Sequence, residues 1–206
     1  MIVATIFVYT TLRQKILQNE STGTAKPDHL AAWIAEEKRL WGDAALNAAP
    51  APISHAQLLS MSGLEVMQAM LRREVPAPPI AKTLDFVLIA VAYGRTVFQG
   101  TPGYAHYNPL GSVHGGWFAT LLDSALGCAV HTMMPPGRGY TTAELGINIV
   151  RALTDKVPRV RAEATVIHCG RQLATAEARL VGPDGTLYAH GTTTCLVFEM
   201  PATPRS

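Results

Sequence analysis

A chain of 206 residues, 48% of them hydrophobic and 16% charged, is long enough to bury a substantial core, so we expect one domain with an extension. The formal net charge of +2 is too small to indicate nucleic acid as a main partner. Its three cysteines are odd in number and form no Cys-x-x-Cys pair, which argues against a disulfide framework or a zinc site. A reducing cytoplasm is therefore the expected location.

The first 60 residues are predicted to be a partly helical extension, and nothing in them indicates chemistry. The apolar run at residues 2–9 is far shorter than the roughly 20 residues of a membrane helix and suits a short strand or an interfacial segment. After a polar joint at residues 19–28, apolar positions at helical spacing predict an amphipathic helix with Trp33 and Trp41. Both indoles suit a partner surface, but we favour docking on the protein's own domain.

The domain is predicted to span residues 61–206, and a second helix is expected from His55 to Arg73, across that boundary. The proline-rich segment at 75–80 should end this helix. From Leu84 onward the apolar pattern has a period of two, which is typical of strands. Strands are predicted at residues 84–92, 95–100, 141–151, 160–168, 172–181 and 186–198.

In the strand at residues 141–151, alternation places Leu145 and Ile147 on one side with Ala143 and Ile149. The other side carries Thr142, Glu144, Gly146 and Asn148. A buried helix is predicted between the second and third strands. Two strands, one helix and four further strands favour an α+β fold, in which an antiparallel sheet wraps around a central helix.

The central helix contains the feature that most needs explanation. Residues 117–130 are almost all apolar or small, so the helix should be buried on nearly all sides, yet Asp123 lies in its middle. A buried carboxylate needs a partner or a chemical role. His114, Gly115 and Gly116 should open the helix, where free backbone N–H groups and the helix dipole favour a carbonyl oxygen that gains negative charge.

The segment NPLGSVHGG, followed by an Asp nine residues after the His, resembles the PaaI-type hotdog-fold thioesterases over residues 61–198. The resemblance implies hydrolysis of acyl-CoA thioesters by dimers or dimers of dimers, without a cofactor or metal. Asp123 would be the catalytic base or nucleophile, and Gly115 would present its N–H to the thioester oxygen beside His114. Asn108 would hold the reacting water or the carbonyl region, and Thr142 falls where some relatives have a Ser.

Helix geometry adds a condition to this interpretation. Gly115 and Asp123 are eight residues apart, or about 12 Å along the axis at 1.5 Å per residue. One thioester carbonyl cannot contact both at about 3 Å. We therefore predict a shared site, in which Gly115 and His114 of one protomer face Asp123 and Thr142 of its neighbour.

Substrate contacts are predicted at Gly116, at Trp117 in an apolar tunnel, and at Arg138 and Arg171, where CoA phosphates would dock. The acyl group stays open, since phenylacetyl, benzoyl and medium-chain groups all suit such a tunnel. His114 also suits a simple helix cap, and Asn108 a simple turn residue.

Two functional alternatives remain. The first is an acyl-CoA-binding module without turnover. The second is a hotdog hydratase or dehydratase, which is less favoured because those enzymes carry a His five residues after the helix Asp, where this chain has Cys128.

Overall fold

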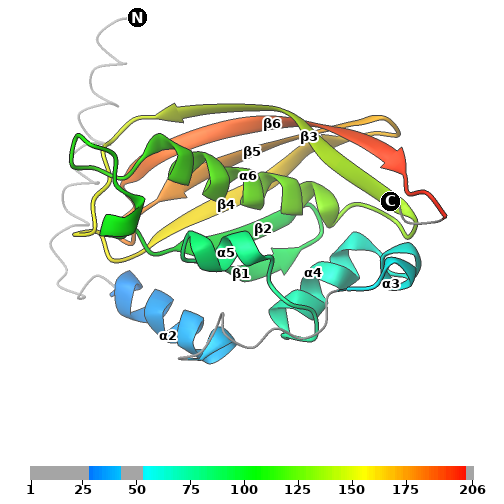
Figure 1. Ribbon diagram of the computed structural model, residues 1–206, viewed down its shortest axis with the longest axis horizontal. Helices are drawn as coiled ribbons and strands as arrows, with labels where there is room; N and C mark the ends of the chain where they lie inside the picture. Colours follow the sequence, from blue (N-terminus) through cyan, green and yellow to red (C-terminus); the bar gives the residue numbers. More distant parts are fainter. Residues whose placement is uncertain (1–27, 43–52, 203–206) are drawn as a thin grey trace, which may run out of the picture.

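The computed structural model describes residues 28–42 and 53–202, shown in Figure 1. The predicted apolar segment at 2–9 and almost all of the polar joint at 19–28 lie outside the described residues. Within the described ranges no helix is long and apolar enough to cross a membrane.

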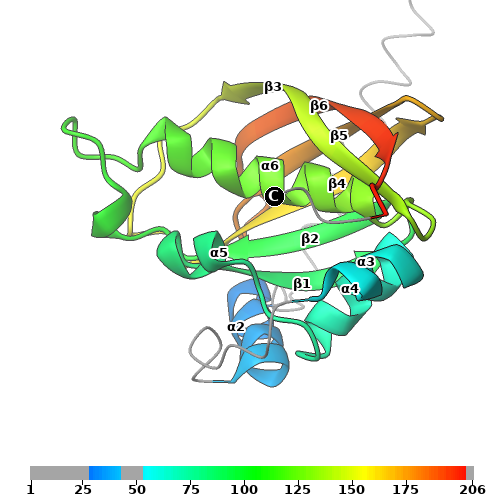
Figure 2. The ribbon, with the colours of Figure 1, turned by 45° about the vertical axis from the view of Figure 1, so that its right-hand side comes forward.

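One antiparallel sheet of six strands forms the body of the fold, in the order β1-β2-β4-β5-β6-β3. It curves around a single long helix, α6 (Gly115–His131), as Figures 1 and 2 show. The strands are β1 (Phe86–Ala92), β2 (Arg95–Gly100), β3 (Arg138–Ile149), β4 (Val160–Cys169), β5 (Leu173–Val181) and β6 (Leu187–Glu199). The predicted α+β architecture is confirmed, and all the strand ends fall within three residues of their predicted positions.

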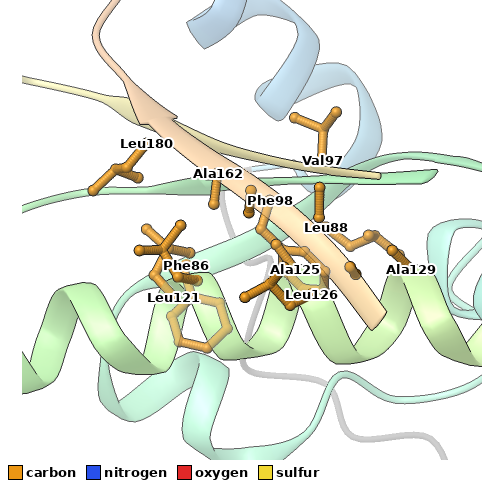
Figure 3. Close-up of a cluster of buried hydrophobic side chains, with 14 of the residues drawn as sticks. Phe86, Leu88, Val97, Phe98, Leu121, Ala125, Leu126, Ala129, Ala162 and Leu180 are labelled. Carbon is orange, nitrogen blue, oxygen red and sulfur yellow. The ribbon is translucent and has the colours of Figure 1, made fainter. Parts of the chain in front are cut away.

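The core lies between α6 and the concave face of the sheet. Leu121, Ala125 and Leu126 of α6 are fully buried, and Figure 3 shows their side chains between the helix and the strands. Small strand residues such as Ala162 and Ala176 are also fully buried, so the helix can pack close to the sheet. The apolar half of α6 thereby fixes the orientation of its other half.

The expectation that α6 is covered on nearly all sides is wrong for the single chain. A stripe along the helix remains partly or fully accessible; it comprises Gly116, Ala119, Thr120, Asp123, Ser124, Cys128 and His131. These positions recur at helical spacing and so share one face. Asp123 therefore lies on a half-buried stripe and not inside a closed core.

Helix α2 (His29–Trp41) lies on the face of the sheet that points away from α6 (Figure 3). Trp41 is 3% exposed, and its indole N–H donates to the Leu88 carbonyl over 2.7 Å. The Arg161 guanidinium lies 4.3 Å from the centre of the Trp33 ring. Docking of both indoles on the protein's own domain is thus confirmed.

Two ion pairs add to this attachment of α2. Arg159 pairs with Glu37 and Arg161 with Glu36, each at 2.7 Å. The domain boundary between residues 60 and 61 stays a prediction.

The single helix predicted from His55 to Arg73 is two helices, α3 (His55–Ser60) and α4 (Gly63–Leu71). Ser62 interrupts it, because its side chain caps α4 and Glu65 bonds back to the Ser62 backbone in a capping box. A further short helix, α5 (Pro79–Thr83), begins within the proline-rich segment. Proline favours the first turn of a helix as well as its end, so the composition alone was ambiguous.

Strand β3 contains an irregularity that changes which residues share a side. Its register against β6 shifts between Thr142 and Glu144, so Ala143 is an extra residue in the strand. Thr142 consequently points toward α6, as do Leu145 and Ile147, which pack on the core. The prediction that Thr142 and Leu145 lie on opposite sides is wrong, because alternation is reset at the bulge.

Candidate functional site

Asp123 and Thr142 meet between α6 and β3. The Thr142 hydroxyl donates to the Asp123 carboxylate over 3.1 Å, and both side chains are half-buried. They line a cavity of about 200 Å³, whose other walls include Phe86, Phe98 and Tyr140. A carboxylate, a hydroxyl and an apolar enclosure are thus in one place, which suits proton removal from a bound water or direct attack on an electrophile.

The N-terminal end of α6 presents its first backbone amides. His114 is the N-cap, and its Nδ1 accepts a hydrogen bond of 2.8 Å from the Gly116 N–H. The Gly115 N–H, at the first helical position, has no acceptor within the helix. Gly115 lines a second cavity of about 320 Å³, together with Asn108, Phe118 and Ile149. This end suits an oxygen that carries negative charge, as helix N-termini do.

Asn108 shapes the loop that leads into α6. Its side-chain carbonyl accepts from the Leu110 N–H at 2.9 Å, and its amide nitrogen donates to the Ser112 hydroxyl at 3.1 Å. A 3-10 turn, η1 (Tyr104–His106), precedes it, and the His114 N–H donates to the His106 carbonyl. Asn108 therefore lies beside Gly115, with its carboxamide engaged by the loop.

Gly115 and Asp123 do not meet in one chain. Each lines a different cavity, and the helical rise between them is about 12 Å. Thr142 accompanies Asp123, whereas His114, Gly116 and Asn108 accompany Gly115. The predicted catalytic residues thus fall into two groups at separate positions along α6.

The predicted substrate-binding residues are dispersed. Trp117 is 3% exposed, and its indole N–H donates to the Leu84 carbonyl at 2.8 Å, so it lies in the core. Arg138 and Arg171 do lie together, lining a third cavity of about 270 Å³. The Arg138 guanidinium donates to the Arg171 carbonyl, and its buried Nε has no partner among the described residues.

Among the residues of the Asp123 cavity that the sequence analysis did not predict as site residues are two ionisable ones, Tyr140 and Cys128. Burial raises the pKa of Tyr140 well above its usual range, with a smaller contribution from nearby acidic groups. Burial, with the charge of Asp123, raises the pKa of the Cys128 thiol to about 12. Both groups therefore stay protonated near neutral pH. The sequence could have indicated Tyr140, because it precedes Thr142 by two residues and residues at that spacing share one side of a strand.

Comparisons with known proteins agree with this fold. A family model described as Thioesterase superfamily matches residues 110–189, which contain α6 and all of β3, β4 and β5. A solved structure from Ralstonia eutropha JMP134, described as a "putative thioesterase, phenylacetic acid degradation-related protein", is 30% identical. It superposes with a TM-score of 0.58 over 63% of this chain and 98% of that chain.

Two further relatives are similar. A mutant of the phenylacetic acid degradation protein PaaI from Thermus thermophilus is 27% identical, with a TM-score of 0.52 over 58% of this chain and 98% of that one. A Halobacterium salinarum protein named "Putative esterase" is 35% identical over 82 residues. That match covers 40% of this chain and spans about half, 54%, of the curated relative.

Proposed function

Because the chain belongs to the thioesterase superfamily and has a PaaI-type hotdog fold, we propose that this thioester hydrolase cleaves acyl-CoA to a free acid and CoA. The observation that carries the proposal is the Asp123 carboxylate, which is held by Thr142 at the wall of a largely apolar cavity. A thioester carbonyl is already electrophilic, so hydrolysis needs a base or nucleophile and a donor for the carbonyl oxygen.

With Asp123 as the base, the reaction balances as follows. The carboxylate takes a proton from water while the water oxygen bonds to the thioester carbon, and the carbonyl oxygen becomes an oxyanion. The Gly115 N–H at the start of a helix stabilises this oxyanion. Collapse breaks the carbon–sulfur bond, and the CoA thiolate takes up the proton. With Asp123 as the nucleophile, its carboxylate attacks the thioester carbon, and the carbon–sulfur bond breaks to expel CoA thiolate and leave an anhydride. Water then hydrolyses the anhydride to the free acid and the Asp123 carboxylate, and a proton of that water goes to the thiolate.

We propose that the oxyanion donor comes from a second copy of the chain. Two observations support a twofold dimer. Strand β3 is an edge strand, and along its outer side none of the described strands pairs with it (Figure 2). The accessible stripe of α6 contains Asp123, which accepts a hydrogen bond from Thr142 of that edge strand. A partner that covers this stripe in antiparallel orientation would bring its Gly115 toward Asp123, and the twofold axis would create two equivalent sites.

The remaining residues have supporting roles in this proposal. His114 orders the first turn by accepting from the Gly116 N–H, which leaves the Gly115 N–H free for substrate. Asn108 shapes the adjoining loop. Arg138 and Arg171 supply positive charge for the phosphates of CoA.

The first test is thiol release from a panel of acyl-CoA compounds by the wild type and by Asp123→Asn. This substitution keeps the shape of the side chain but removes the base and the nucleophile. We expect a loss of kcat of at least about 100-fold, with acyl-CoA binding retained. Binding without thiol release by the wild type would instead identify an acyl-CoA-binding module.

The second test is complementation between two inactive chains, Asp123→Ala and Gly115→Pro. Proline removes the N–H and is favoured at the first helical position, and His114 already has the extended backbone (φ −64°, ψ 140°) that precedes proline. A mixed dimer should regain one working site of two. Gly115→Ala is the matched control, because it keeps the N–H and its methyl would meet only the end of the Ile149 side chain at 3.3 Å. Absence of any recovery in mixed dimers would rule out the shared site.

A further inference from the structure

A cavity of about 920 Å³ lies on the outer face of the sheet, which points away from α6 and carries α2 (Figure 3). Its described walls come from the start of α2, the loop before β4 and the turn between β5 and β6. The larger apolar side chains in these walls include Leu30, Trp33, Val157 and Val181. A concave and largely apolar space of this size suits a small organic molecule.

Tyr188 of β6 brings an unpaired hydroxyl to this cavity. The residue is 7% exposed, and its hydroxyl has no hydrogen-bond partner among the described residues. The hydroxyl oxygen keeps some access to solvent, unlike the fully buried unpartnered atoms, which are His131 Nδ1 and Arg138 Nε. Burial raises the pKa of this phenol, so it stays protonated near neutral pH. An unpaired hydroxyl on a side chain buried to this extent favours a ligand or a water that satisfies it.

The Tyr188 hydroxyl lies near the carboxylate of Asp184. A Cβ built on Gly182 would stand 3.0 Å from that carboxylate and 3.7 Å from the hydroxyl, so the glycine leaves the space beside both groups open. Thr186 donates to Asp184 from its hydroxyl and from its N–H, and these hydrogen bonds lower the pKa of the carboxyl. Asp184 is therefore negatively charged at neutral pH, and its orientation is fixed by the turn.

Carboxylates outnumber cations around the cavity. The lining includes Asp28, Glu163 and Asp184, against Lys156 and His29. Histidine side chains are ordinarily neutral at pH 8, so at that pH the described lining residues carry a surplus of negative charge. The Glu163 carboxylate makes no ion pair or hydrogen bond with a described residue, although Arg179 lies opposite it in the register of β4 and β5. The cavity is therefore better suited to a cation than to an anion.

We propose that this cavity binds a small organic ammonium ion with an apolar body. The body packs against Leu30, Trp33 and Val181, and the ammonium group donates hydrogen bonds to the Tyr188 oxygen and the Asp184 carboxylate. The Tyr188 ring adds attraction for positive charge. Binding here does not depend on the proposed acyl-CoA hydrolysis, because none of the described lining residues belongs to the proposed catalytic groups.

Two indole compounds of opposite charge test the proposal. Tryptamine carries an ammonium group and indole-3-propionate a carboxylate, each on a two-carbon chain from the same ring. Binding of each to the full chain is measured at pH 8 by ligand-observed NMR. We expect tryptamine to bind with a dissociation constant of about 1 mM, which is ordinary for a ligand of this size. Its affinity should exceed that of indole-3-propionate by roughly tenfold, because the anion meets the surplus of carboxylates.

Substitutions locate the site. Tyr188→Phe should weaken tryptamine binding by about fivefold, the value of one hydrogen bond, and Asp184→Asn by about threefold. Glu177→Gln is the matched control for the lost charge. Glu177 is also an exposed carboxylate on a neighbouring strand, but it lines a different cavity, so the affinity should stay at its wild-type value. Asp123→Asn should likewise leave it unchanged, since Asp123 lines the cavity next to α6.

Three results would overturn the proposal. The first is no detectable binding of tryptamine, or binding of indole-3-propionate that is equally tight or tighter. The second is wild-type affinity for tryptamine in either Tyr188→Phe or Asp184→Asn. The third is weaker binding in Asp123→Asn, which would place tryptamine in the other cavity.

Discussion

The Thr142 hydroxyl donates a hydrogen bond to the Asp123 carboxylate over 3.1 Å, from an edge strand to the central helix. This contact exists because the bulge at Ala143 turns Thr142 toward α6. It orients the carboxylate at the wall of its cavity.

Replacement of Thr142 by valine is expected to lower kcat/KM by about tenfold, because a hydrogen bond to a charged group is lost and the carboxylate is free to rotate. Thr142→Ser keeps the hydroxyl and should retain most of the activity. Steady-state thiol release measures both. Equal rates for the valine and serine variants would show that the contact has no part in turnover.

Stability is expected to fall as pH rises above 9, partly because of Cys128. The pKa of its thiol is about 12 in the folded chain, against an ordinary value of 9, so the unfolded chain releases a proton that the folded chain keeps. Between pH 9 and 12 this group should remove about 1.4 kcal/mol of unfolding free energy per pH unit. Urea unfolding at several pH values measures the slope. Cys128→Ala should reduce the slope by the contribution of one proton, about 1.4 kcal/mol per pH unit. An unchanged slope would show that Cys128 does not cause this loss of stability.

Helix α2 is expected to contribute to the stability of the domain. Trp41→Ala removes a buried indole and its hydrogen bond to Leu88, which should cost about 3 kcal/mol of unfolding free energy. Ile34→Ala, on the same helix but 41% exposed, should cost less than about 1 kcal/mol. Urea unfolding of both variants provides the comparison. Equal losses of unfolding free energy in the two variants would mean that α2 does not stabilise the domain, as expected if the domain begins after residue 60.

Gly63 joins α4 to the end of α6. A Cβ there would lie 1.7 Å from the His131 carbonyl oxygen, and the Gly63 N–H donates to the Met134 carbonyl at 2.9 Å. Because the obstacle is backbone, Gly63→Ala should destabilise the protein by more than about 2 kcal/mol. Gly111→Ala meets no atom within 4 Å and carries only the strain of its positive φ, so a cost of about 1 kcal/mol is expected. Thermal unfolding that ranks the two in the reverse order would refute this packing argument.

Local patterns in the chain were enough to predict the fold class, the positions of the six strands and the helix that carries Asp123. Those features depend on periodicity and on turn residues, which short segments contain in full. The N-cap at His114 could be predicted for the same reason, since a cap involves residues only two positions apart.

Local patterns could not predict which side chains line the same cavity, because that depends on packing between distant segments. Alternation along residues 141–151 could not reveal the bulge at Ala143, because a bulge is a relation between two strands. Trp117 is buried with its indole N–H donated to the carbonyl of Leu84, 33 residues away. The space above Gly127 that admits the Tyr140 hydroxyl is likewise set by contacts between distant segments, and no local pattern encodes such contacts.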